Sequence, residues 1–376
     1  MKKTILTLPL LAVILATSIN FISCSKKAEL QPVTFKTLEV KKDNITVCVD
    51  PRTEVLLIAS RLAEISFFAN HDMDSDDYIT GIDKIMEKQK NHEFVKLLKS
   101  MTKNYKGGIY QLLTLSKYIS EDFTEINFTK KTVPAEIEAL CKNLDTKKFI
   151  TLLNDFVNAS NLSRVWLLYE SYMKANLFDV SDFYDKYPNV TRWISEYFFD
   201  ASTKQIFKVH VSPIMNYYHI LTPYSTYDGV NNFFICQSPG LNKVNNFSDI
   251  NLAITMCGSF YITYLREHYE SFKNYIEKMM NDWAVKNNYT EKFQDFNYIG
   301  YATDWISYVT IINYIEKFSP EDSKELYISS IESSLPMEEL ISLKDVFKYY
   351  DENRANYPTM ESFLNNYLAD YLSKLN

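Results

Sequence analysis

The apolar positions of the chain are most regular between Ser248 and Phe272, where they recur every three or four residues. This is the spacing of one face of an α-helix. The other flank is apolar as well, so the pattern predicts a central helix that is buried nearly all round. Ser248 is a suitable N-cap, and the small residues around Gly258 predict close approach of another backbone or a ligand. The first face consists of Ile250, Ile254, Cys257, Tyr261, Leu265, His268 and Phe272.

Helical periodicity dominates the rest of the chain, and strand signals are confined to two short segments. Residues 206–211 and 232–236 predict strands shortly before the central helix. The polar, tyrosine-rich stretch 216–229 between them predicts a surface loop or the wall of a cleft. The expected fold class is mainly α, of the α+β type, with a small sheet preceding a buried central helix. Further helices are expected at 53–69 (with Thr53 as cap), 76–90, 93–103, 108–120, 134–142, 145–158, 163–177, 182–199 (interrupted at Pro188), 270–285, 297–318, 320–334, 337–351 and 359–374 (with Thr359 as cap).

The first 23 residues have the features of a signal peptide. Two lysines precede an apolar run that ends at Ile22, and Ser23 and Cys24 follow. A small residue before a cysteine at this place is typical of bacterial lipoproteins, in which the cysteine becomes the acylated N-terminus. We therefore expect Cys24 to carry palmitate-type acyl chains that hold the protein in the cell envelope, at the outer membrane. An ordinary signal peptide and an N-terminal membrane helix are the alternatives.

The mature chain contains no glycine-rich or proline-rich linker and no repeat of fixed period. Residues 1–23 are the expected signal peptide, residues 24–45 a polar tether, and residues 46–376 a single large domain. Within this domain we expect a helical part over 46–200, the small sheet and central helix over 205–272, and C-terminal helices over 273–376.

Composition narrows the range of functions. The chain has 40 lysines and arginines, of which two lie in the signal peptide, so 38 remain against 47 acidic residues and the mature net charge is −9. An acidic chain without basic clusters is not expected to bind nucleic acid. The 7 glycines form neither common glycine-rich phosphate loop. The four cysteines after Cys24 lack CxxC spacing, so we expect small buried residues rather than disulfides or zinc ligands.

Catalytic and metal-binding motifs are weak. The five histidines include no pair at i and i+4, and neither HExxH nor GxSxG occurs. Residues 72–83 resemble a calcium-binding loop at four positions, but Asp77 stands where the loop needs glycine. An acidic connector before a helix is the preferred interpretation.

Four segments carry a combination of motifs that extends over nearly the whole mature chain. The most specific is 349–363, which reads Tyr-Tyr-x-x-Asn-Arg-x-x-Tyr-Pro-Thr-x-x-x-Phe, and the others are 49–63, 78–95 and 107–110. Together they resemble an uncharacterised family of bacterial lipoproteins whose typical members carry HExxH and look like zinc metallopeptidases. The resemblance implies a zincin-like fold.

The central helix departs from that family at its metal-binding motif. In typical members the helix carries HExxH followed by serine and an aromatic residue. When the motif is aligned on Ser259 and Phe260, its positions are occupied here by Ile254, Thr255 and Gly258. The family's further glutamate would fall near Asp304, in a stretch without glutamate. Because catalytic zinc needs three protein ligands, we expect no zinc site and no cofactor.

Three functions remain open. The preferred one is a membrane-anchored pseudoenzyme that binds an unknown ligand or protein. The second is a hydrolase that works through other residues, for which the cleft candidates are His219, paired with Asp304 or Glu267, and Ser259. The third is a surface glycan-binding lipoprotein, suggested by four tyrosines that the sequence places in a polar loop: Tyr217, Tyr218, Tyr224 and Tyr227.

Overall fold

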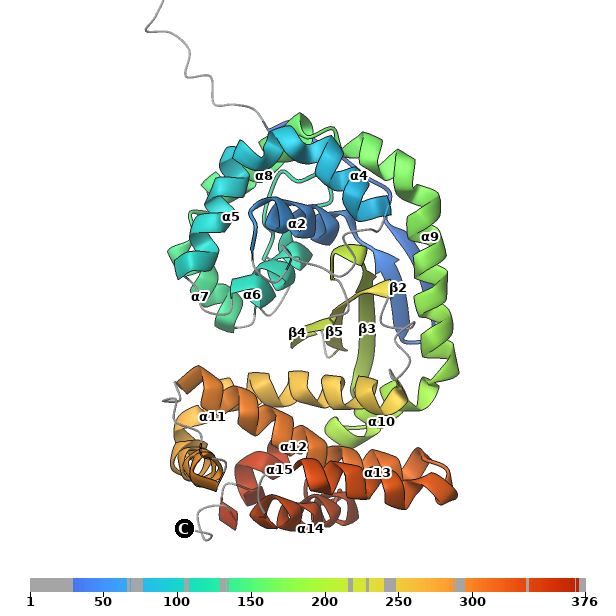
Figure 1. The fold of residues 1–376 in the computed structure, drawn as a ribbon, viewed down its shortest axis with the longest axis vertical. Helices are drawn as coiled ribbons and strands as arrows, with labels where there is room; N and C mark the ends of the chain where they lie inside the picture. Colours follow the sequence, from blue (N-terminus) through green and yellow to red (C-terminus); the bar gives the residue numbers. More distant parts are fainter. Residues whose placement is uncertain are drawn as a thin grey trace, which may run out of the picture.

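A five-stranded sheet lies between two groups of helices (Figure 1). The chain is mainly helical with a small sheet, as the sequence predicts. The computed structural model describes residues 30–65, 68, 77–104, 108–128, 133, 135–215, 219–227, 230–239, 248–286, 288, 295–335, 338–368 and 370–371. The order of the strands in the sheet is β1-β2-β3-β5-β4. Their bounds are β1 Leu38–Lys42, β2 Ile45–Val49, β3 Lys204–Val211, β4 His219–Tyr227 and β5 Val230–Gln237.

The three central strands of the sheet are parallel, and each outermost strand is antiparallel to its neighbour. β2, β3 and β5 run in the same direction, whereas β1 pairs antiparallel with β2 and β4 with β5. The β1–β2 turn contains Asp43 with φ 48°, a left-handed conformation that aspartate tolerates better than most residues. The β2–β3 connection spans all helices from α2 to α10. The carboxyl ends of three parallel strands therefore lie at one edge of the sheet.

Three of the strands differ from what the sequence predicts. β1 lies within the predicted tether 24–45, so the ordered domain begins before residue 46. β4 occupies most of the stretch predicted as a surface loop, because its threonines, serine and tyrosines pair with β5. β2 is absent from the prediction, which assigned residues 24–45 to the tether and 46–200 to the helical part.

The helices follow the predicted order closely. Pro188 separates α9 from α10, as the sequence indicates. α9 packs along β1, β2 and β3, and α11 packs against β4 (Figure 1). The helical bounds are α2 Pro51–Leu62, α4 Asp77–Met86, η1 Glu87–Asn91, α5 Glu93–Asn104, α6 Gly108–Leu115, η2 Ser116–Tyr118, α7 Ala135–Asn143, α8 Thr146–Ala159, α9 Leu162–Lys186, α10 Pro188–Phe198, η3 Pro213–Met215, α11 Asp249–Lys286, α12 Asp295–Phe318, α13 Glu321–Ser334, α14 Glu338–Glu352, α15 Met360–Phe363 and the π-helical turn η5 Leu364–Leu368.

Helix caps agree with the sequence at two of three positions. The Ser248 hydroxyl accepts a hydrogen bond from the amide of Asn251, and Thr359 forms a capping box at α15. The first helix differs, because Asp50 rather than Thr53 is its N-cap. Thr53 lies one turn inside, where its hydroxyl pairs with Ser116.

The expected central helix is the first part of α11, which continues to Lys286 with one non-helical residue at His268. The prediction that this helix is buried nearly all round is wrong for one face. The half-buried face includes Ile254, Thr255, Gly258 and Ser259. The buried stripe consists of Leu252, Ala253, Met256, Cys257, Phe260, Tyr261, Tyr264 and Leu265.

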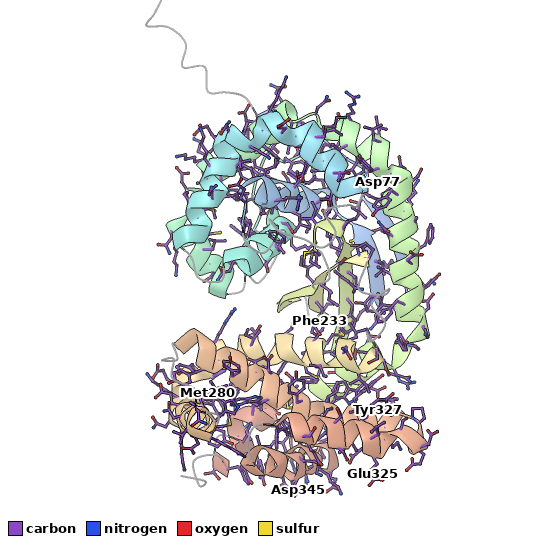
Figure 2. The ribbon with its side chains drawn as sticks, viewed as in Figure 1. Asp77, Phe233, Met280, Glu325, Tyr327 and Asp345 are labelled. Carbon is purple, nitrogen blue, oxygen red and sulfur yellow. The ribbon has the colours of Figure 1, made fainter. Side chains whose placement is uncertain are left out.

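Aromatic contacts join the sheet to the end of α10. Phe233 of β5 stacks on Phe207 of β3 with ring centroids 4.7 Å apart and meets Phe199 at 5.4 Å (Figure 2). In α10, Trp193 stacks on Tyr197 at 5.2 Å. Such aromatic pairs stabilise the fold beyond the contribution of the area that they bury, because the positive edge of one ring attracts the negative face of another.

Arg354, in the segment 349–363 that carries the most specific family motif, fastens the C-terminal helices to the end of α10. Its guanidinium donates hydrogen bonds to the carbonyls of Glu196, Tyr197, Phe199 and Pro358 at 2.7 to 3.0 Å. These carbonyls lie at or beyond a helix end, where the helix itself provides no donors. The motif therefore serves the fold.

Candidate functional site

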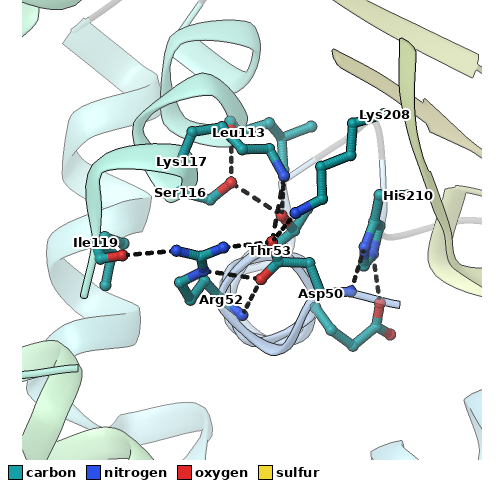
Figure 3. Close-up of polar contacts among 10 residues, drawn as sticks. Asp50, Arg52, Thr53, Leu113, Ser116, Lys117, Ile119, Lys208 and His210 are labelled. Atoms are coloured by element: carbon teal, nitrogen blue, oxygen red, sulfur yellow. Dashed lines mark hydrogen bonds and ion pairs between the residues drawn. The ribbon is translucent and has the colours of Figure 1, made fainter. Parts of the chain in front are cut away.

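A cluster of charged side chains lies where β2 ends and α2 begins (Figure 3). Asp50 follows the last residue of β2, and its carboxyl oxygen accepts a hydrogen bond from the amide of Arg52 at 3.1 Å. The Asp50 amide in turn donates to Nδ1 of His210, on the neighbouring strand β3, at 3.0 Å. The two parallel strands thus fix the position of Asp50 at the carboxyl edge of the sheet.

Three cationic side chains from three different elements converge on the Asp50 carboxylate. Arg52 of α2 donates through Nε to Oδ1 at 2.9 Å and through Nη2 to Oδ2 at 2.8 Å. Lys208 of β3 and Lys117 of η2 reach the same Oδ2 at 3.2 Å and 3.4 Å. We call Asp50, Arg52, Lys117 and Lys208 the basic cluster.

Neighbouring side chains hold the cations in place. Lys117 Nζ lies 3.5 Å from the centre of the Phe234 ring, a cation–π contact. Arg52 Nη1 donates to the carbonyl of Ile119 at 3.1 Å. The cluster is therefore positioned by an aromatic ring and a loop as well as by its central carboxylate.

The basic cluster carries more positive than negative charge. Three cations share one carboxylate, and the Asp50 side chain is 0% exposed whereas those of Arg52, Lys117 and Lys208 are 16%, 17% and 32% exposed. The carboxylate is sealed, and the cations retain a path to solvent. An arrangement of this kind suits an anion that approaches from the solvent side.

The pKa values reflect this balance. Burial alone would raise the pKa of Asp50, but Lys117, Arg52 and Lys208 outweigh it and hold the pKa well below the ordinary value. Burial lowers the pKa of Lys117 to about 8, because the attraction of Asp50 only partly offsets the loss of water and the repulsion from Lys208. Of the three cations in the cluster, Lys117 is thus the one with a lowered pKa, whereas the pKa values of Arg52 and Lys208 are raised.

A second buried network lies behind the cluster, around Glu54. Its carboxylate accepts hydrogen bonds from the hydroxyls of Tyr78 at 2.6 Å and Ser212 at 3.0 Å, and His210 Nε2 lies 2.9 Å away. Because Nδ1 of His210 already accepts the Asp50 amide, Nε2 carries the proton and donates to Glu54. Both ring nitrogens are engaged and the ring is fully buried, so His210 has no free atom with which to act on a ligand.

The positions of the lost zinc motif lie elsewhere, on the half-buried face of α11. The Thr255 hydroxyl donates to the carbonyl of Asn251, and Ile254 packs against the core. A methyl group at Gly258 would lie 3.7 Å from Oγ of Ser307 in α12, an ordinary van der Waals distance. The nearest atoms belong to side chains, so the predicted close approach of another backbone at Gly258 is not found among the described residues.

The cleft candidates are distributed over three elements. His219 begins β4, where it pairs with Gln237, and its side chain is outside the described residues. Ser259 is half-buried on α11, and Asp304 is exposed on α12. Because the side chains of His219 and of Glu267 in α11 lie outside the described residues, the pairing of His219 with Asp304 or Glu267 stays a prediction.

The remaining motifs find little support. Of the calcium-loop stretch, residues 77–83 are helical in α4, and Asp83 pairs with Arg61 at 2.6 Å, so this half is not a ligand loop. Tyr217 and Tyr218 lie outside the described residues, as do the side chains of Tyr224 and Tyr227 in β4. As expected, Cys48, Cys236 and Cys257 are fully buried, whereas Cys141 is only partly buried.

Two further observations concern the described chain as a whole, and a third its relation to known proteins. Within the described ranges, no group of three or more histidine, cysteine, aspartate or glutamate side chains could hold a metal ion. None of the helices in that part of the chain is long and apolar enough to cross a membrane. No family model, curated protein or solved structure matches this chain, so the family resemblance stays a prediction.

The basic cluster has no counterpart among the sites that the sequence predicts. Its four members are spread from residue 50 to residue 208, and only Asp50 and Arg52 are close in sequence. A usable signal existed at Lys208 and His210, two polar residues on one face of a strand that is otherwise apolar from Ile206 onward. A charge on the covered face of a strand needs a partner, and that partner is Asp50.

Proposed function

We propose that this protein is a lipid-anchored protein of the cell envelope that binds a small anionic ligand at the basic cluster without transforming it. The observation that supports the proposal is the convergence of Arg52, Lys117 and Lys208 on the single buried carboxylate of Asp50. The ligand would be a molecule with a phosphate, sulfate or carboxylate group.

The energetics of the cluster favour an anion. Removing several like charges from water is costly unless counter-charges accompany them. Asp50 and Glu121 act as negative charges on these cations, and a bound anion would further offset the repulsion of Lys117 by Lys208 and Arg52. Arginine offers paired donors to oxyanions and lysine a mobile point charge, a combination suited to phosphate and carboxylate groups.

The position of the cluster supports binding as well. In sheets with parallel strands, ligands commonly lie beyond the carboxyl ends of the strands, where helix N-termini contribute positive potential. Here β2 and β3 end beside the N-terminus of α2.

Binding without chemistry is favoured over hydrolysis by two features. The zinc ligands of the resembling family are replaced at Ile254, Thr255 and Gly258. The histidine nearest to the cluster, His210, uses both ring nitrogens for structural hydrogen bonds.

Titration calorimetry would test the binding proposal. We expect inorganic phosphate, sulfate or succinate to release or absorb heat on binding to the wild-type protein. The anion that binds most tightly indicates whether the ligand carries a phosphate or sulfate group or a carboxylate group. Lys117→Met and Lys208→Met should weaken binding by roughly tenfold or more each. The matched control is Lys42→Met, because Lys42 pairs with Asp185 on the surface outside the cluster. Equal affinity in all four proteins would contradict the proposal.

The enzyme alternative has its own test. A lysine with a lowered pKa can act as a nucleophile toward carbonyl compounds. Incubation with pyruvate and borohydride followed by mass spectrometry would reveal an adduct on Lys117. The proposal predicts none, and a stoichiometric adduct would replace it with a catalytic role.

The anchor is tested separately. Cys24→Ala should leave the protein unprocessed or soluble, whereas the wild-type protein should stay in the membrane fraction at high salt, since screening does not weaken apolar burial. Release of the wild-type protein by salt alone would contradict acyl anchoring.

A further inference from the structure

The chain is fastened to the body of the protein soon after the proposed lipid-bearing cysteine. The Gln31 amide donates to Oδ1 of Asn154 at 3.1 Å, and Nδ2 of Asn154 donates to the Gln31 carbonyl at 2.8 Å. A few residues further, the indole of Trp166 donates to the carbonyl of Lys36 at 3.1 Å. These contacts fix the start of the described chain to the end of α8 and the beginning of α9.

This attachment limits how far the body can move from a membrane. Residue 31 is only seven positions after Cys24. Seven fully extended residues span at most about 25 Å, less than the diameter of a domain of this size. A lipid on Cys24 would therefore keep the α8–α9 corner close to the bilayer surface.

The same corner exposes apolar side chains. Leu167 and Leu168, on the second turn of α9, are 76% and 57% exposed although Trp166 beside them is buried. Arg164 is exposed one helical turn before them, and Lys36, whose carbonyl accepts the Trp166 hydrogen bond, is exposed as well. The acidic residue on the next turn, Glu170, is paired with Lys174. Leucines flanked by lysine and arginine are the composition of surfaces that lie on anionic membranes.

The other exposed apolar side chains lack this combination. Phe178 is 56% exposed on α9, but it lies eleven residues beyond Leu167, about 16 Å along the helix, and acidic Asp179 and Asp182 accompany it. Leu326 and Tyr327 lie on α13, and Val285, 80% exposed beside Lys286, lies near the end of α11. Both helices belong to the group on the far side of the sheet from α8 (Figures 1 and 2).

We propose that the α8–α9 corner, with Leu167 and Leu168 at its centre, is the face of the protein that rests on the lipid bilayer. The proposal rests on the lipid anchor at Cys24 described above. It gives the anchored protein one orientation, in which the two leucines enter the interfacial region and Lys36 and Arg164 meet anionic headgroups.

Site-specific fluorescence on the full-length, acylated protein would test this orientation. An environment-sensitive dye is attached through Leu168→Cys or, as the matched control, Leu326→Cys, both in a Cys141→Ser background because Cys141 is the partly buried thiol. The protein is reconstituted into vesicles of phosphatidylethanolamine and phosphatidylglycerol that contain lipids with a quencher on the acyl chain. We expect a blue shift and a loss of emission for the dye at position 168 and neither for the dye at position 326.

Two results would overturn the proposal in distinguishable ways. If the protein stays with the vesicles but the dye at position 168 is quenched no more than the dye at position 326, the anchor stands and the bilayer-facing surface is wrong. If the acylated protein does not stay with the vesicles, the anchor itself is wrong, and the surface proposal fails with it.

Discussion

At the scale of single residues, Asp50 has the most roles. It caps α2, it holds three cations with its carboxylate, and its amide fixes the tautomer of His210. The sequence Val49-Asp50-Pro51 explains the first role, because aspartate followed by proline at the first helical position is a helix start. The other two roles depend on Lys117, Lys208 and His210, which lie more than sixty positions away in the sequence, so no local pattern predicts them.

Asp50→Asn separates the charge of this residue from its capping role, since asparagine is an equally good N-cap. The substitution leaves three partly buried cations without a carboxylate, so we expect the free energy of unfolding to fall by about 3 kcal/mol. Urea denaturation at neutral pH measures this loss. Asp185→Asn, which breaks the exposed pair with Lys42, should cost less than about 1 kcal/mol and serves as control. Equal losses in the two variants would mean that the cluster does not depend on its carboxylate.

Two glycines within helices should respond oppositely to alanine. A Cβ at Gly81 in α4 would overlap the hydroxyl of Tyr169, whereas a Cβ at Gly258 meets nothing closer than 3.7 Å. We expect Gly258→Ala to stabilise the protein by up to about 1 kcal/mol through helix propensity. Gly81→Ala should destabilise it by about 1–3 kcal/mol, because the tyrosine must move. Thermal unfolding of both variants decides this, and a stabilised Gly81→Ala protein would contradict the close contact between Gly81 and Tyr169.

At the scale of secondary-structure elements, α11 illustrates what periodicity can and cannot predict. Its existence, its start at Ser248 and most of its buried stripe follow from apolar residues at helical spacing. The division near its middle agrees with the prediction too, because a kink at non-helical His268 separates the central helix from the stretch predicted as a helix over 270–285. The half-buried face does not follow, since isoleucine, threonine and glycine are compatible with burial and with partial exposure alike.

Restoring the zinc motif on α11 should not restore a metal site. Ile254→His, Thr255→Glu and Gly258→His would place two imidazoles on one face of the helix. A third ligand is lacking, because the region near Asp304 contains no glutamate, and the groups that orient each imidazole are absent as well. An imidazole at position 258 extends beyond the Cβ and would have to fit beside Ser307 and Thr303, whose nearest atoms lie 3.7 and 3.8 Å from that Cβ.

We therefore expect the triple variant to unfold at a lower temperature than the wild-type protein and to gain little from added zinc. Thermal unfolding with and without zinc measures both effects. Tight zinc binding together with peptide cleavage would mean that the remainder of a peptidase site is intact, and the binding-protein proposal would fail.

At the scale of the whole molecule, the sequence predicts the class of fold better than its connections. The helices and the sheet that precedes α11 follow from local patterns. The pairing of β2 with β3 joins residues about 160 positions apart, and the basic cluster depends on that pairing. Local propensity carries no information about such contacts, so neither the five-stranded sheet nor the site at its edge could be derived from spacing alone.

The lowered pKa of Lys117 gives the whole protein a specific dependence on pH. The folded protein loses the lysine proton near pH 8, whereas an unfolded chain keeps it to about 10.5. Between these values the unfolded state binds more protons, so the contribution of Lys117 to stability rises with pH in this window and is constant below it. An anion favours charged Lys117, so binding should have the opposite dependence and should raise the pKa of this lysine.

The most direct test of the anion site is therefore the affinity for sulfate as a function of pH, measured by titration calorimetry from about pH 6 to about pH 10. Sulfate keeps its two charges throughout this range, so changes in affinity report on the protein. Of the neighbouring groups, Asp50 titrates well below the range, burial raises the pKa of Cys48 to about 11, and Lys208 has a raised pKa. We predict an affinity that is steady below pH 8 and falls above it in the wild-type protein, and a weaker, pH-independent affinity in Lys117→Met. The same fall in both proteins, or no binding by the wild-type protein at any pH, would contradict an anion site built around Lys117.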